Sequence, residues 1–223
     1  MHVTLIRHTL SPEELVALGA RLCYSKTDLL GLQQKVAKSD QEGFCRKVIG
    51  MGHESVVEHA SFTFGVEGVS RVLLAQLTRH RLASFSVQSQ RYCGADMKLV
   101  IPDSMCIPEL VDEIVAAKRA VEELYNKAVG LGVPEEDARY LTFQAGTTRL
   151  LLTMNVRELR HFFELRCCNR SQWEIHALAD EMLRICKEVA PALFQDAGPG
   201  CVRGHCPEVE KSCGKPRRIA EWS

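Results

Sequence analysis

QLTRHRLASFSVQSQRY, residues 76–92, concentrates guanidinium, imidazole, hydroxyl and amide groups in one short stretch. Neither Asp nor Glu occurs between Glu67 and Asp96, so the arginines of this interval have no carboxylate close to them in sequence. These arginines are Arg71, Arg79, Arg81 and Arg91. A guanidinium group suits phosphates and other flat anionic groups. The stretch therefore predicts an anionic ligand, and the alternative is a solvated basic helix end with a polar loop.

Two features of this stretch favour the ligand. Gln76 and Arg79 are three residues apart in a segment that Ser70 is expected to cap, so they share one face of a helix. Arg-His-Arg at residues 79–81 then leads into an expected loop rich in Ser and Gln. That triplet, followed after seven residues by Ser-Gln-Arg-Tyr at residues 89–92, resembles the signature of the flavin-dependent thymidylate synthases. The resemblance extends over roughly residues 4–195.

The composition fits one folded domain without a general excess of charge. Hydrophobic residues make up 46% of the sequence, and 28 basic residues balance 28 acidic ones. This balance argues against a nucleic-acid or membrane-surface binder, which carries a basic excess. The sequence shows neither a signal-peptide pattern nor a long apolar run, and its ten cysteines follow no compact disulfide spacing. We therefore expect a cytoplasmic protein with reduced thiols.

Hydrophobic periodicity predicts the elements of the first fifty residues. Alternation over residues 2–7 predicts a strand. Ser-Pro-Glu-Glu at residues 11–14 predicts a capping box and a helix that runs to about Arg21. Residues 33–49 are predicted to form one further helix. Its inward side chains are expected to be Val36, Phe44 and Val48.

Residues 53–59, which read His-Glu-Ser-Val-Val-Glu-His, place four ionisable side chains directly before a strand expected at about residues 61–66. Metal ligation is one interpretation, although the spacing is not that of the zinc-protease helix. A surface loop and polar contacts to a bound ligand are the others. The resemblance favours ligand contacts, because a similar stretch of the family touches the flavin. The matching residues are His53, Ser55 and Glu58.

The middle of the chain is expected to alternate strands and helices. The expected elements are a short strand at residues 98–101, a long amphipathic helix at 108–131, a short helix after residue 134 and a buried strand at 147–154. The short helix carries Arg139, for which an ion pair with Glu135 or Glu136 is one interpretation. The resemblance implies instead that this arginine helps to hold the nucleotide.

Asn155 is expected to cap a helix that has a polar stripe, which on most helices is simply the solvated side. The resemblance implies flavin contacts for members of this segment, namely Asn155, Val156, Arg157 and His161. It also implies that Arg166 grips the uracil ring. Gln-Trp-Glu at residues 172–174 resembles the segment that opens the last helix of the family, and we interpret Trp173 as a packing residue.

After residue 196 the sequence becomes rich in Gly, Pro and Cys. We therefore divide the chain into a catalytic domain, residues 1–196, and a C-terminal tail, residues 197–223. Three cysteines and a histidine in the tail allow a tetrahedral zinc site, although no Cys-x-x-Cys pair occurs. These residues are Cys201, His205, Cys206 and Cys213. A partly ordered tail with free thiols is the other interpretation.

The resemblance implies an α/β (α+β) fold in which one compact domain has a central, mostly antiparallel sheet flanked by long helices. It implies a homotetramer with flavin sites shared among chains. The implied enzyme is a methyltransferase-type thymidylate synthase that converts dUMP to dTMP, with 5,10-methylenetetrahydrofolate as carbon donor, NADPH as reductant and FAD as redox carrier. Tetrahydrofolate is released, and no cysteine nucleophile is used. We expect no nucleic-acid or membrane partner.

The same resemblance assigns roles to individual residues. Arg166 is the expected catalytic residue, because a positive charge at the imide edge of uracil favours the ionised imide. The expected nucleotide contacts are Gln76, Arg79, Val87, Gln88, Ser89, Gln90, Arg91, Arg139 and Arg166. The expected flavin contacts are His53, Ser55, Glu58, Arg79, His80, Arg81, Val87, Asn155, Val156, Arg157 and His161.

Several positions depart from the family pattern. Ser86 and Val87 stand where many members have Asn and then Glu or Gln, so contacts there are expected to be weaker or to come from the backbone. His161 replaces a frequent Asn, and Arg170 replaces a frequent His.

Two other classes of function account for parts of the sequence. A nucleic-acid-binding module would place the arginines on phosphates and stack Phe85 or Tyr92 on bases, but the neutral overall charge disfavours it. A flavin-free nucleotide-binding enzyme, for example a phosphohydrolase, would need a Gly-rich phosphate loop or a cluster of carboxylates for metal, and neither is evident in the sequence. Bound flavin distinguishes the thymidylate synthase from both.

Overall fold

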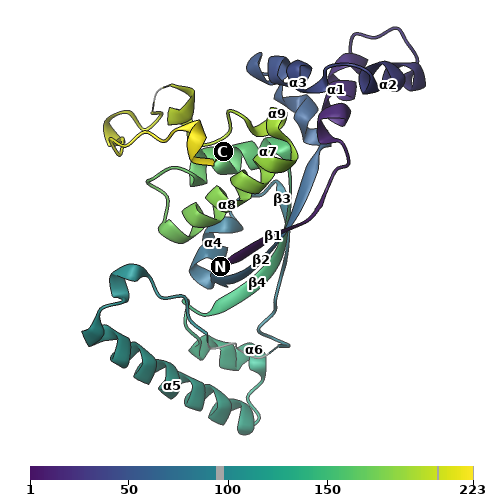
Figure 1. Ribbon diagram of the computed structural model, residues 1–223. Helices are drawn as coiled ribbons and strands as arrows, with labels where there is room; N and C mark the ends of the chain where they lie inside the picture. The colour runs from purple at the N-terminus through teal and green to yellow at the C-terminus, as the bar shows by residue number, and fades with distance from the viewer. Residues whose placement is uncertain (94–97, 205, 223) are drawn as a thin grey trace. The chain divides into compact units, whose positions relative to one another are not determined.

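The computed structural model describes residues 1–93, 98–204 and 206–222. Within these residues four strands form one antiparallel sheet in the order β1-β2-β4-β3 (Figure 1). The strands are β1 (His2–His8), β2 (Ser61–Ser70), β3 (Ala83–Val87) and β4 (Thr147–Asn155). Alternate residues of β4 and of most of β2 are buried, as expected for strands that turn one face to a core. The predicted mixed class with an antiparallel sheet is confirmed.

The chain divides into two compact units. The first unit comprises residues 1–2, 65–79 and 85–151, and the second comprises residues 3–64, 80–84 and 152–223. The boundary runs through the signature stretch. Arg79 and Arg91 belong to the first unit, whereas His80 and Arg81 belong to the second.

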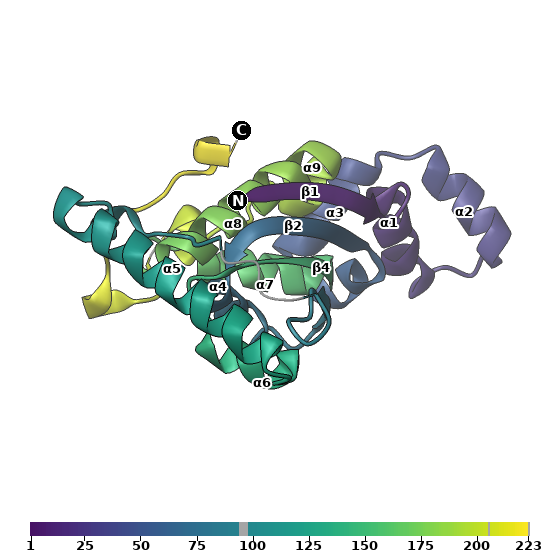
Figure 2. The ribbon, with the colours of Figure 1, turned by 90° about the horizontal axis from the view of Figure 1, so that it is seen from below.

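The first unit carries a long helix with a small core of its own. Its helices are α4 (Arg71–Leu77), α5 (Pro108–Gly130) and α6 (Glu135–Ala138). Helix α6 lies against α5, where Tyr125 and Ala138 are buried with Val121 and Val129 packed around them (Figure 2). The predicted cap of α4 is confirmed, because the Ser70 hydroxyl accepts a hydrogen bond from the Leu73 amide at 3.0 Å.

The second unit has an aromatic core. Its helices are α1 (Pro12–Leu22), α2 (Leu29–Ala37), α3 (Gln41–Gly50), α7 (Val156–Arg166), α8 (Trp173–Val189) and α9 (Pro191–Phe194). Phe194 meets Phe62 of β2 edge-on at 5.6 Å between ring centroids and Phe163 of α7 at 6.0 Å. All three rings are fully buried. Burying one such ring stabilises the fold by about 1.5–3 kcal/mol, so this cluster fixes α7 and α9 against the sheet.

The single helix predicted at residues 33–49 is wrong, because two helices occupy this region. Helix α2 ends at Ala37 and α3 begins at Gln41. The Asp40 carboxylate accepts a hydrogen bond from the Gly43 amide at 2.8 Å. A carboxylate in this position satisfies an amide that would otherwise lack a partner at a helix start, so Asp40 favours a new helix over continuation of α2.

Three further expectations are corrected. Ser11 has φ of 45° and makes no side-chain cap, so the predicted capping box is wrong, although α1 does begin at Pro12. The loop expected after the Arg-His-Arg triplet is strand β3, in which Ser84 and Ser86 are exposed and their neighbours partly buried. Instead of a strand, residues 98–101 contribute one isolated bridge, between Leu99 and Gly146.

The tail contains short 3-10 turns at Gly200–Arg203, Val209–Lys211 and Ile219–Trp222. Its last turn is docked, because Trp222 is buried. Cys201, Cys206 and Cys213 are free thiols. No group of three or more metal-ligating side chains is assembled within the described residues, and His205 of the predicted zinc set lies outside them. None of the described helices is long and apolar enough to cross a membrane.

Candidate active site

A buried polar relay in the second unit connects the signature to the end of α7. His80 is 5% exposed, and its Nε2 accepts a hydrogen bond from Arg166 Nε at 3.1 Å. Its Nδ1 lies 3.2 Å from Glu158 Oε1. Because Nε2 faces a donor, the proton of a neutral imidazole must be on Nδ1, which then donates to Glu158. The sequence Arg166 to His80 to Glu158 is therefore a chain of directed hydrogen bonds.

The electrostatics of the relay support this assignment. Burial, then the charge of Arg166 and then His161, lower the pKa of His80 to about 4, so the imidazole is neutral at physiological pH. Burial also raises the pKa of Glu158. The contact between His80 and Glu158 is therefore a hydrogen bond of a neutral imidazole and not an ion pair. A neutral, buried base beneath Arg166 orients this guanidinium without cancelling its positive charge.

The start of α7 is built as predicted. The Asn155 side chain accepts a hydrogen bond from the Glu158 amide at 2.9 Å and so caps the helix. Val156 is fully buried, whereas Arg157 and His161 point to the exposed side of α7. The His161 ring lies edge-on to His80, with ring centroids 6.2 Å apart.

Two predicted flavin-contact segments meet through Arg157. Its Nη1 pairs with Glu58, which belongs to the 3-10 turn Glu54–His59. Its Nε lies 3.7 Å from a carboxylate oxygen of Glu54. These bonds raise the pKa of Arg157, with the hydrogen bond to Glu58 as the largest cause. The structure thus brings Glu58 and Arg157 together, although they are 99 residues apart in sequence.

A pocket of about 780 Å³ lies in the second unit beside this turn. Its lining combines cationic, aromatic and hydroxyl side chains, namely Arg21, Tyr24, Ser25, Phe44, Lys47, His53 and Ser55 among others. Arg21 Nε is buried and has no hydrogen-bond partner among the described residues. His53 and Ser55 of the predicted flavin set line this pocket. A buried guanidinium nitrogen without a partner, beside a lysine, fits a phosphorylated ligand.

In the first unit, Arg71 and Arg139 form a second cationic group. Arg71 Nη2 donates to the Gln88 carbonyl at 3.3 Å, while its Nε is buried without a hydrogen-bond partner among the described residues. Burial, and second the charge of Arg139, lower the pKa of Arg71. Arg139 Nε donates to the Glu136 carbonyl at 3.1 Å and not to a carboxylate. Two neighbouring positive charges of this kind favour an anion between or beside them.

The remaining signature residues are placed individually. Arg91 pairs with Glu136 at 2.6 Å, so the sequence argument that it lacks a counter-ion does not hold for this arginine. Ser89 accepts a hydrogen bond from the Arg91 amide. Arg79 and Arg81 are exposed, and neither side chain makes a hydrogen bond or ion pair with a residue that the structure describes. Gln76, Val87, Gln88 and Gln90 are partly exposed.

Sequence reasoning missed Glu158, which is 6% exposed and supports His80. Its only sequence signal is the spacing Asn155-x-x-Glu158, which is typical of a capping box. The interpretation of Trp173 as a packing residue is wrong within this chain, because its side chain is 48% exposed at the start of α8.

Within the described residues, Arg79 and Arg81 have no ion-pair partner and guanidinium nitrogens of Arg21 and Arg71 are buried without a hydrogen-bond partner, an arrangement typical of proteins that bind anionic ligands. Comparison with known proteins identifies the family. The profile of the thymidylate synthase complementing protein family matches residues 4–192. The chain is 49% identical to a flavin-dependent thymidylate synthase from Geobacter sulfurreducens, over 98% of this chain and 96% of the relative. It is 39% identical to one from Pyrococcus furiosus, over 99% and 98%.

Two solved structures share the fold. One is a UMP/dUMP methylase PolB from Streptomyces cacaoi bound with 5-Br dUMP, with a TM-score of 0.74 and 23% identity over 86% of this chain and 92% of that chain. The other is the flavin-dependent thymidylate synthase ThyX from Helicobacter pylori in complex with FAD and dUMP, with a TM-score of 0.68 and 24% identity over 89% and 100%. The chain belongs to the flavin-dependent thymidylate synthase family, which confirms the resemblance seen in the signature.

Proposed function

We propose that this chain converts dUMP to dTMP with 5,10-methylenetetrahydrofolate as carbon donor and NADPH as reductant through FAD, and that it releases tetrahydrofolate. Family membership carries the reaction class. The observation in this chain that supports it best is the set of cations without counter-ions around the signature. Arg79 and Arg81 are exposed and unpaired with respect to the described residues, and Arg71 has a buried guanidinium nitrogen without a partner there.

Arg166 is the proposed catalytic residue. Uracil carbon 5 becomes nucleophilic when electron density is pushed through the ring, and a fixed positive charge at the imide edge favours the ionised imide. The hydrogen bond from Arg166 Nε to neutral His80 holds the guanidinium in one orientation. Glu158, which accepts from His80, fixes the imidazole in turn. FAD, when bound, supplies the redox chemistry, and the protein supplies position and charge.

The other predicted site residues have proposed roles in binding. Donors of the first unit would hold the nucleotide, namely Gln76, Arg79, Gln88, Ser89, Gln90, Arg91 and Arg139, with Val87 contributing its backbone. The proposed flavin contacts are His53, Ser55, Glu58, Arg79, His80, Arg81, Val87, Asn155, Val156, Arg157 and His161. Capping of α7 by Asn155 and the pair of Arg157 with Glu58 support the second set, since they preorder its side chains.

We propose that no cysteine acts as nucleophile. The thiol next to Arg166 in sequence, Cys167, is fully buried, and burial raises its pKa. Cys167→Ala is therefore expected to form dTMP near the wild-type rate. Removal of a covalent nucleophile would instead lower kcat strongly, by about six orders of magnitude for the catalytic serine of a serine protease. Steady-state dTMP formation measures the difference, and Cys168→Ala is the matched control. A collapse of kcat in Cys167→Ala with normal flavin content would contradict the proposal.

The homotetramer is also a proposal. Helix α5 was predicted to be amphipathic, yet much of its apolar stripe is exposed, with Val111 and Val115 each 40% exposed and Leu124 50% exposed. Apolar surface of this kind marks contact with another chain. In a homo-oligomer the same stripe is available on every copy. We therefore propose that a second copy covers α5.

Val115→Asp is expected to lower the molecular mass in solution, because a carboxylate at a buried apolar contact is costly to desolvate. Light scattering after size-exclusion chromatography measures the mass. Glu113→Lys, at an exposed polar position of the same helix, is the control and should keep the wild-type mass. A Val115→Asp variant that remains as large as the wild type would exclude α5 from the interface.

We further propose that residues 1–196 form the catalytic part and residues 197–223 a tail, and that the protein is cytoplasmic. Ten free cysteines support a reducing compartment. The decisive experiment for function is spectroscopic. Purified protein should carry FAD absorbance that NADPH bleaches, and it should form dTMP from dUMP and methylenetetrahydrofolate. A protein that stays colourless after incubation with FAD would overturn the proposed function.

A further inference from the structure

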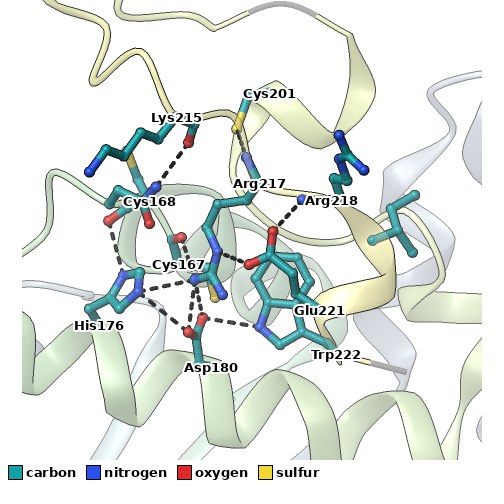
Figure 3. Close-up of polar contacts among 12 residues, drawn as sticks. Cys167, Cys168, His176, Asp180, Cys201, Lys215, Arg217, Arg218, Glu221 and Trp222 are labelled. Carbon is teal, nitrogen blue, oxygen red and sulfur yellow. Dashed lines mark hydrogen bonds and ion pairs between the residues drawn. The ribbon is translucent and has the colours of Figure 1, made fainter.

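The end of α7 is held by side chains from α8 and the tail (Figure 3). His176 Nδ1 lies 3.1 Å from the Arg166 carbonyl and 3.0 Å from the Cys168 carbonyl. Arg217 Nη1 donates to the Cys167 carbonyl at 3.1 Å. The last carbonyls of a helix have no intrahelical partner. Here the carbonyls of three successive residues at the end of α7 receive donors from elsewhere in the second unit.

The two donors are themselves fixed by a compact network. Since Nδ1 of His176 faces two acceptors, it carries the proton, and Nε2 accepts from Arg217 Nη1 at 3.0 Å. The same Nη1 lies 2.8 Å from each carboxylate oxygen of Asp180. We call His176, Asp180, Arg217, Glu221 and Trp222 the C-terminal clamp.

Glu221 and Trp222 complete the clamp from the tail. Arg217 Nε donates to Glu221 at 2.7 Å, and the Trp222 indole nitrogen donates to Asp180 at 3.1 Å. The Trp222 ring also stacks on the guanidinium, with Cζ of Arg217 4.3 Å from the ring centroid. Trp222 is 4% exposed, so this stacking is shielded from water. The Arg217 guanidinium is thus held by the carboxylates of Asp180 and Glu221 and by the ring of Trp222.

We propose that Arg217, with its clamp partners, positions Arg166 for the methylation of dUMP. Arg166 is the last residue of α7, and its guanidinium makes the contact with His80 that begins the buried relay. Last turns of helices fray unless their carbonyls are satisfied. By holding the carbonyls of residues 166–168, the clamp fixes the backbone from which the Arg166 side chain projects. Arg217 is a positioning residue, and this role rests on the proposed function.

Arg217 lies outside the region that the family profile matches, which ends at residue 192. The role therefore falls to a residue of the tail, a segment over which the relatives also align, since they cover 98–99% of the chain. A surface arginine on α8, the helix that carries His176 and Asp180, is available for comparison. Arg184 of α8 is exposed, and its ion pairs with described residues are to Glu181 and Glu188 of the same helix.

The test uses the full-length protein with Arg217→Met, Arg217→Lys and the control Arg184→Met. Arg217→Met keeps an apolar stem against Trp222 but removes every donor. In the wild type a single nitrogen, Nη1 of Arg217, makes the contacts to the Cys167 carbonyl, His176 and Asp180. Arg217→Lys therefore keeps one charged donor that can replace it. Five quantities are measured: flavin content, the rate of flavin bleaching by NADPH without dUMP, kcat, KM for dUMP, and amide hydrogen exchange of residues 163–171 in flavin-free protein.

Arg217→Met is expected to lower kcat for dTMP by roughly 10- to 100-fold, the cost of a displaced catalytic group, while flavin content and bleaching stay at wild-type levels. Exchange at the Cys167 and Ser171 amides, which are bonded to Phe163 and Cys168 carbonyls, should accelerate. Arg217→Lys should recover part of both losses. Arg184→Met should match the wild type.

Two results would overturn the positioning role. Either kcat is unchanged in Arg217→Met, or flavin bleaching falls in parallel with kcat, which indicates general damage. The exchange measurement needs no flavin. A wild-type protein that binds no flavin would therefore refute the proposed function, whereas unchanged exchange in Arg217→Met would refute the clamp itself.

Discussion

Arg166→Ala is expected to retain bound FAD and to lose dTMP formation by about 100- to 1000-fold, the usual cost of removing one preorganised donor from a developing charge. Arg166 lies at the end of α7, and the neutral His80 orients it without neutralising it. Removal of the guanidinium leaves the uracil imide without its counter-charge. Flavin absorbance and steady-state dTMP formation on the same preparation measure both parts of the prediction.

Arg184→Ala is the matched control, because it removes an exposed arginine whose ion pairs lie within α8. It should keep both flavin and turnover. If Arg166→Ala formed dTMP at the wild-type rate, Arg166 would have no place in the mechanism. If it lost flavin together with activity, its role would be in binding the cofactor.

The second prediction concerns acid stability. The pKa of His80 is about 4 in the folded protein, against 6.5 for an unperturbed histidine in the unfolded chain. Between these pH values the unfolded chain therefore binds a proton that the folded chain does not. Stability contributed by neutral His80 is therefore present above about pH 6.5 and is lost as the pH falls toward 4. The difference corresponds to roughly 3 kcal/mol. Urea denaturation at fixed protein concentration, from pH 7 to pH 4, measures it.

His80→Gln is the informative variant. A glutamine amide can donate to Glu158 and accept from Arg166, yet it does not titrate. The raised pKa of Glu158, caused by burial, acts in the opposite sense, because the folded state then gains relative stability as the pH falls. Glu158 is present in both proteins, so the difference between their pH profiles isolates His80. Parallel profiles for wild type and His80→Gln would show that His80 does not carry the acid sensitivity.

Local signals predicted much of the fold correctly. The alternation in β1 and β2, the serine before α4 and the asparagine before α7 each act within a few residues, and each has the predicted structure. The Arg-His-Arg signature identified the family. The break between α2 and α3 was missed because the apolar period continues across it, while the cap provided by Asp40 is a single side-chain hydrogen bond.

The buried relay and the C-terminal clamp could not be predicted from the sequence for a different reason. His80 is surrounded by polar residues in sequence but is buried through contacts with Glu158 and Phe162 of a distant helix, α7. Arg217 lies in a polar stretch of the tail. Its partner Asp180 lies off the apolar stripe of α8, where hydrophobic periodicity predicts a solvated side chain. Burial of polar groups by distant segments leaves no local pattern, so the prediction of a loose tail could not anticipate a docked Trp222.

The sheet order has a consequence for synthesis on the ribosome. Strand β2 lies between β1 and β4, and Thr63 of β2 bonds to Thr153 of β4 across 90 residues of chain. While the nascent chain emerges, β1 can pair with β2 early, but the other edge of β2 waits until residue 155 has been made. During that interval an apolar strand with open backbone groups is exposed, the condition that recruits chaperones or leads to aggregation.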